Sequence, residues 1–113
     1  MSHDIQTLEL TIEQAKKSVE LMKKLERLHK NRDFKAIIED ELFNEYAKTL
    51  TLMVADPSLQ SPEDQKDLNL ESHMVGRFRQ YLSSIFQKGR LAEKSILDSE
   101  AELDELRAEG ADE

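Results

Sequence analysis

Three histidines are the side chains in this sequence best suited to bind a metal ion or to transfer a proton, and they stand far apart. None of them, at His3, His29 and His73, belongs to a ligand motif such as His-Glu-x-x-His, in which two histidines share one face of a helix. Glu71 and His73 are two residues apart, and side chains at that spacing do not share a helix face. We interpret the histidines as surface or interface residues and expect no metal site.

Other patterns that could support catalysis are equally incomplete. The carboxylates of Glu39, Asp40, Glu41 and Glu45 could in principle act as acid and base or hold a di-metal centre, but no glutamate of this cluster is followed by a histidine three residues later. Ser83 and Ser84 lack the glycines of a nucleophile elbow. Glycines occur singly, at positions 76, 89 and 110, which excludes a glycine-rich phosphate loop. The sequence therefore predicts a protein that is not an enzyme and needs no cofactor.

Composition limits the classes of protein that remain. The chain has 113 residues, of which 35% are charged and 5% aromatic, with only three glycines and two prolines. Such a composition favours helices within one domain. A net charge of −8 disfavours binding to nucleic acid, whose phosphates would repel the protein. Cysteine is absent, and the sequence shows neither an apolar run long enough to span a membrane nor a signal-peptide pattern.

Two helices are predicted in the first half of the chain, after an N-terminal lead-in over residues 1–11. Thr11 and Gln14 form a capping box, so the first helix is expected at about residues 12–30. Asn31 ends it, and Asp33 caps a second helix over about residues 34–55. Because the connection is very short, these helices are expected to form an αα-hairpin.

A long third helix is predicted over residues 62–109, followed by a short acidic C-terminal end at residues 110–113. Ser61 is a suitable N-cap, and Pro62 fits the first helical position. Apolar residues then recur every seven positions, which is the heptad pattern of a coiled coil. The first seam position holds Leu68, Val75, Leu82, Gly89, Ile96 and Leu103, and the second holds Glu71, Phe78, Ile85, Ala92, Ser99 and Leu106. The predicted fold is all-α, a coiled-coil-like arrangement of three helices within residues 12–109, and the sequence leaves open whether the third helix is continuous through Gly89.

The seam of the third helix is also the predicted protein-interaction surface. Small residues at Gly89 and Ala92 would let a partner helix approach closely, or would accommodate a crossing inside the monomer; both interpretations stay open. Charge is uneven as well: residues 16–32 are mainly basic and residues 98–113 mainly acidic. The two stretches could attract each other within one chain or between two, or simply face solvent. The predicted contact residues are Leu82, Ile85, Gly89, Ala92, Ile96 and Leu103.

Basic and aromatic residues are interleaved between residues 77 and 94, a pattern that can bind single-stranded nucleic acid. Phe78 lies on the seam, and Tyr81 and Phe86 flank it, so we interpret these rings as core residues. Nucleic acid is therefore not the expected partner.

Several short segments resemble small acidic helical proteins of tailed bacteriophages that are encoded among virion assembly genes. The segments are LELTIEQAK (8–16), NRDFK (31–35), MVADPSLQSPE (53–63), RQYL (79–82) and LAE (91–93). The resemblance implies a scaffold, an assembly chaperone or a minor structural protein that binds a phage structural protein or itself, in the host cytoplasm or the virion. A different hypothesis is that the acidic stretch from Asp98 to Glu113 imitates nucleic-acid phosphates and inhibits a basic host protein.

Overall fold

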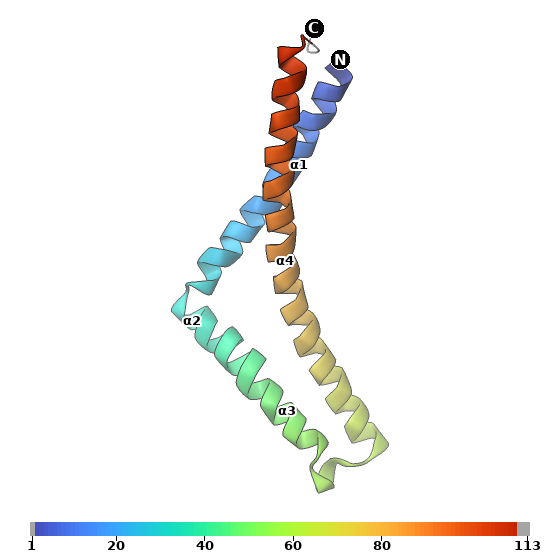
Figure 1. Ribbon diagram of the computed structural model, residues 1–113. Helices are drawn as coiled ribbons and strands as arrows, with labels where there is room; N and C mark the ends of the chain where they lie inside the picture. The colour runs from blue at the N-terminus through green and yellow to red at the C-terminus, as the bar shows by residue number, and fades with distance from the viewer. Residues whose placement is uncertain (1, 111–113) are drawn as a thin grey trace. The chain divides into compact units, whose positions relative to one another are not determined.

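The computed structural model describes residues 2–110, with side chains from Asp4 onward, and every long element within that range is a helix (Figure 1). No strand occurs among these residues, so the all-α class and the long third helix are confirmed. Residues 111–113, which make up most of the predicted acidic end, lie outside the described residues. The elements are α1 (Ser2–His29), α2 (Arg32–Phe34), η1 (Lys35–Tyr46), α3 (Ala47–Val54), η2 (Pro57–Leu59) and α4 (Pro62–Ala108).

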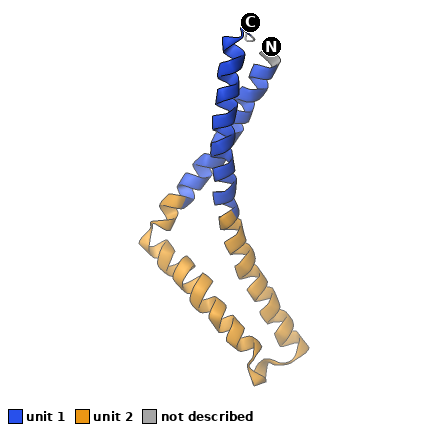
Figure 2. Ribbon diagram, in the orientation of Figure 1, with its two compact units in different colours: residues 1–25, 84–113 blue, residues 26–83 orange. Residues whose placement is uncertain are grey.

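Two compact units share α4 (Figure 2). Unit 1 contains residues 1–25 and 84–113, and unit 2 contains residues 26–83. The second half of α4 therefore packs in unit 1 and the first half in unit 2. The helix is continuous through Gly89, a point that the sequence leaves open.

Unit 1 is an antiparallel pair of helices, because the start of α1 packs against the end of α4. Its core joins Ile5 and Ile12 to Leu103. Further along, Met22 lies directly against Gly89. The partly buried apolar residues that complete this core are Leu8, Ile96 and Leu106. Within unit 1, α1 therefore packs against α4. The predicted hairpin between α1 and the second helix stays a prediction.

The predicted lead-in over residues 1–11 is wrong, because α1 begins at Ser2. Thr11 does not cap the helix but lies inside it, where its hydroxyl donates a hydrogen bond to the Thr7 carbonyl at 2.9 Å. The reason is tertiary: Ile5 is 94% removed from solvent through its packing with Leu103 in the core of unit 1. Burial of an apolar side chain outweighs a local preference for a cap at Thr11.

The second helical segment runs from Arg32 to Val54 and has a π-helical centre, η1. Its N-cap is Asn31 and not the predicted Asp33, since the Asn31 side chain accepts a hydrogen bond from the Phe34 backbone N–H at 2.9 Å. In a π-helix each backbone hydrogen bond spans five residues, which brings residues four and five apart onto one face. The partly buried residues between Arg32 and Ala47 are Phe34, Ile38, Glu39, Leu42, Phe43, Tyr46 and Ala47.

Side-chain amides close the end of α3 and connect it to α4. The Val54 carbonyl, which the helix leaves without a partner, accepts hydrogen bonds from Gln60 Nε2 at 2.9 Å and Gln65 Nε2 at 3.1 Å. Ser61 then caps α4, because its hydroxyl oxygen accepts the Asp64 N–H at 3.0 Å. These local contacts fix the start of α4 at Pro62, the predicted position.

Candidate protein-binding surface

An exposed apolar face runs along the first half of α4, within unit 2. Leu70, Met74, Phe78 and Tyr81 follow one another at spacings of four, four and three residues, so they share one side of the helix. Between 41% and 69% of the surface of each residue is exposed. We call these four residues the α4 stripe. A continuous row of large apolar side chains on a helix surface is typical of a site that binds another protein.

Phe78 anchors the stripe to the interior of unit 2. Its ring lies 5.6 Å from the ring of Phe43 on η1, measured between centroids and at an angle of 54°. Tyr46, one helical turn further along the same segment, donates a hydrogen bond from its hydroxyl to Glu71 on α4. These two contacts hold the first half of α4 against η1 and so fix the direction in which the α4 stripe faces.

A groove of about 390 Å³ lies beside this contact. Its apolar walls come mostly from η1, where Ile37 is among the most exposed apolar residues of the chain, and carboxylates stand at its rim. Such a groove suits a large apolar side chain of a partner. The lining residues are Ile37, Ile38, Glu41, Leu42, Tyr46 and Glu71.

The hydrogen bond between Tyr46 and Glu71 changes the acidity of the phenol. Donation to the Glu71 carboxylate raises the pKa of Tyr46 above its ordinary value of 10.0, and partial desolvation and the carboxylate charge act in the same direction. The fold thus favours the neutral phenol. The hydrogen bond therefore stabilises the fold fully at pH values below the pKa of Tyr46 in the unfolded chain. This stabilisation is lost as the pH rises through the pKa of Tyr46 in the folded chain.

An absorbance titration tests this contact. Because the chain has two tyrosines, a Tyr81→Phe background leaves Tyr46 as the only one. We expect Tyr46 to ionise at a higher pH than the same residue in the urea-unfolded chain, and Glu71→Ala to abolish most of that difference. Glu63→Ala, also on α4, is the matched control and should leave the titration unchanged. Identical titrations of Tyr46 before and after the Glu71→Ala change would contradict the contact.

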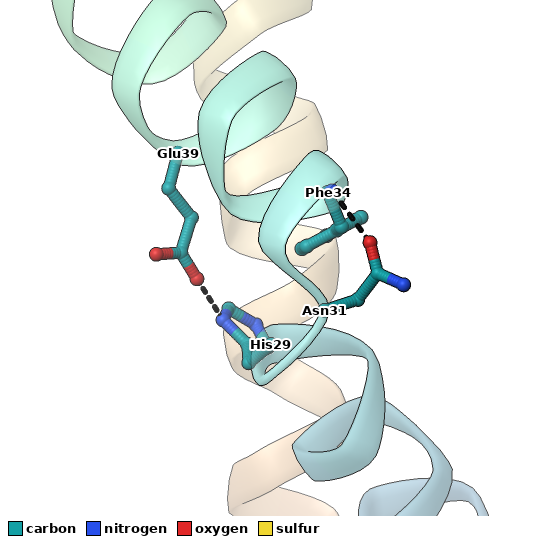
Figure 3. Close-up of polar contacts among 4 residues, drawn as sticks. All are labelled: His29, Asn31, Phe34 and Glu39. Carbon is teal, nitrogen blue, oxygen red and sulfur yellow. Dashed lines mark hydrogen bonds and ion pairs between the residues drawn. The ribbon is translucent and has the colours of Figure 1, made fainter.

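A second polar contact, at the turn between α1 and α2, holds His29 (Figure 3). The His29 Nδ1 pairs with a Glu39 carboxylate oxygen, and the imidazole packs edge-on against the Phe34 ring at 5.4 Å between centroids. Glu26 also precedes His29 by three residues, the spacing used in di-metal bundles. The described residues nevertheless include no group of three or more histidine and carboxylate side chains placed to hold a metal ion. Glu39 and Phe34 thus position His29 in the turn.

Two further grooves run along the first half of α4. One, of about 430 Å³, is lined by Asn69, Ser72, His73, Gly76, Arg77 and Gln80. Another, of about 540 Å³, shares Asn69 and His73 with it. Both are formed by side chains of a single helix, and His73 is exposed on that surface.

The structure separates the six predicted contact residues. Gly89, Ala92 and Leu103 are buried in unit 1, and Ile96 is partly buried against the core there. Gly89 has no side chain and therefore leaves room for Met22 of the same chain. This contact agrees with the interpretation that the small residues accommodate a crossing of two helices inside the monomer. Leu82, in unit 2, and Ile85, in unit 1, are half-buried. The second half of the seam therefore contributes to the fold of unit 1.

None of the four residues of the α4 stripe was among the six predicted contacts, although Phe78 lies on the predicted seam. Leu70, Met74 and Tyr81 lie outside the two seam positions, and the interpretation of Tyr81 as a core residue is wrong, since 62% of its surface is exposed. A signal was present in the sequence. Large apolar residues outside the two seam positions widen the apolar face beyond what one partner helix covers.

No protein family, curated protein or solved structure matches the chain. Within the part of the chain that the structure describes, every helix is too short or too polar to cross a membrane.

Proposed function

We propose that this chain is a non-enzymatic helical protein that binds other protein chains and supports virion assembly in a tailed bacteriophage. Its role would be that of a scaffold, an assembly chaperone or a minor structural protein, in the host cytoplasm or the virion. The observation that carries the proposal is the α4 stripe, an exposed row of large apolar side chains beside an apolar groove. The resemblance of segments 8–16 and 53–63 to phage proteins supports the phage context.

The stripe has the chemistry of a protein-binding site. Tyrosine, phenylalanine and methionine are enriched at the centres of protein interfaces, where they bury a large area and lose little conformational freedom. A partner helix that presents apolar residues at spacings of three and four would match the spacing of the stripe. The partner proposed for it is a structural protein of the phage head or tail.

Site-specific photo-crosslinking during infection tests the proposal. A photoreactive amino acid in place of Met74 should give an adduct with a phage head or tail protein. The same amino acid in place of Ser72, an exposed residue on the same helix but a different face, should not. With the partner identified, Tyr81→Ala should weaken binding at least about tenfold, as expected for a central interface tyrosine. Equal adducts from positions 72 and 74, or adducts with host proteins alone, would refute the proposal.

The second candidate function, inhibition of a basic host protein by charge mimicry, has a specific observation in its favour. The acidic side chains of α4 from Asp98 to Glu109 are all exposed, and four of them, Asp98, Glu102, Glu105 and Glu109, lie on one side of the helix. Binding to such a protein would weaken steeply with salt and would not depend on Met74 or Tyr81. Crosslinking from the acidic part of α4 to a host nucleic-acid-binding protein would favour this function over assembly.

A further inference from the structure

The charged residues of unit 1 are sorted along its length. Because α1 and α4 are antiparallel here, the acidic end of α4 lies beside the acidic start of α1. On α1 this acidic end contains Asp4, Glu9 and Glu13. On α4 it contains Asp98, Glu100, Glu102, Asp104, Glu105 and Glu109. All nine of these side chains are exposed.

The adjacent part of unit 1 carries the opposite charge. On α1 this basic part contains Lys16, Lys17, Lys23 and Lys24, interrupted by Glu20. On α4 it contains Lys88, Arg90 and Lys94, interrupted by Glu93. The seven basic side chains are all exposed. Unit 1 thus has an acidic end and a basic part that follow each other along the helix pair.

Packing within the chain does not neutralise the acidic end. Arg107 is the only lysine or arginine in residues 2–13 and 98–110, and it pairs with Glu9 at 3.2 Å. Several of the other carboxylates stand four residues apart on one helix, as Asp98 and Glu102 do, and like charges at that spacing repel each other. The basic stretch could have neutralised these carboxylates, but the antiparallel pairing of α1 with α4 places it beside other cations instead.

We propose that unit 1 binds a second copy of this chain, antiparallel, with the acidic end of each copy against the basic part of the other. The charge changes sign between Glu13 and Lys16 on α1 and between Lys94 and Asp98 on α4. A twofold axis at that boundary makes the surface complementary to itself. At a rise of about 1.5 Å per residue, the acidic end of α4 is about 17 Å long and its basic part, from Lys88 to Lys94, about 9 Å, so the basic part of each α4 can face the nearer half of the acidic end of the other.

An exposed leucine stands at the proposed axis. Leu97 lies between the basic and acidic parts of α4, and 69% of its surface is exposed. In a twofold dimer a residue on the axis meets its own equivalent, so the two Leu97 side chains would cover each other. The resulting contact is mainly ionic with one apolar point at its centre, and it therefore weakens as salt is added.

Light scattering on the full chain, with paired charge reversals, tests the dimer. At about 20 mM salt the parent chain should have the mass of a dimer, and at about 500 mM salt, where charges are screened within a few ångströms, that of a monomer. The variant Lys88→Glu/Arg90→Glu/Lys94→Glu should be monomeric at low salt, and so should Glu102→Lys/Asp104→Lys/Glu105→Lys. An equal mixture of the two should give a heterodimer, because each reversed surface then faces its complement.

The mixture also separates loss of binding from loss of folding, since a misfolded variant would not recover its partner. Circular dichroism at low salt should show that both variants keep the helix content of the parent. A parent chain that is monomeric at low salt would overturn the proposal and leave the acidic end to a basic protein of another kind. A dimer that persists at high salt, or a mixture that stays monomeric, would overturn it equally. Because the α4 stripe takes no part, failure here does not affect the proposed function.

Discussion

The Gly89→Leu variant is expected to unfold at a clearly lower urea concentration than the parent chain, with a loss of about 3 kcal/mol in the free energy of unfolding. A Cβ atom at position 89 would lie 2.8 Å from the Met22 Cγ and closer still to the Met22 Cβ. The Met22 Cβ is fixed by its own backbone, so rotation of the side chain does not relieve the overlap. The two helices of unit 1 must separate, and the buried Met22 side chain is then exposed to water.

Gly76→Leu is the matched control for this change. Gly76 lies on the same helix, and a Cβ atom there would meet nothing within 4 Å. Leucine forms helices better than glycine by up to about 1 kcal/mol, so this variant should be slightly more stable than the parent. Urea titrations followed by circular dichroism at 222 nm measure both effects. If the two leucines changed stability in the same direction, the close approach of Met22 to Gly89 would be refuted.

The elements that sequence analysis predicted well are those whose limits depend on neighbouring residues. Ser61 and Pro62 define the start of α4, since a hydroxyl cap and a proline at the first helical position act within one turn. The all-α class followed from composition and periodicity in the same way. Neither feature requires knowledge of which segments meet in space.

The start of α1 and the π-helical centre of η1 could not be predicted by the same means. Residues 2–11 are helical because Ile5 packs against Leu103, from the other end of the chain, and a capping box at Thr11 carries no information about that contact. The apolar residues of the second helical segment fit an α-helix as well as a π-helix, because Phe34, Ile38, Leu42 and Tyr46 recur at spacings of four. Since π-helices are rare, an α-helix is the default interpretation.

The contact residues predicted from the sequence and the α4 stripe lie on the same helix but are different residues. A heptad pattern shows that Gly89, Ala92 and Leu103 face a partner helix, and the pattern is the same whether that helix belongs to another chain or to this one. In unit 1 the partner is α1 of the same chain. Only the structure shows that Leu70, Met74 and Tyr81 are exposed on one side of the first half of α4.

Substitution of Leu103 tests whether the seam packs against a helix of the same chain or binds a helix of another chain. The residue is 5% exposed and packs with Ile5 and Ile12 at the centre of unit 1. Leu103→Ala should therefore lower the free energy of unfolding by about 2–5 kcal/mol, the range observed when a buried leucine is truncated. Equilibrium urea unfolding at high salt, where self-association through exposed charges is suppressed, is the appropriate measurement.

Leu91→Ala provides the comparison that makes the result decisive. Leu91 is on the same helix and in the same unit, but 69% of its surface is exposed. Its truncation should change the free energy of unfolding by no more than about 0.5 kcal/mol. If Leu103 instead served as a free contact for another chain, both substitutions would have equally small effects on the isolated protein, and only the Leu103 variant would lose binding. A large loss of stability for Leu103→Ala alone would mean that α1 occupies this part of the seam, and that a binding partner must use another face of α4.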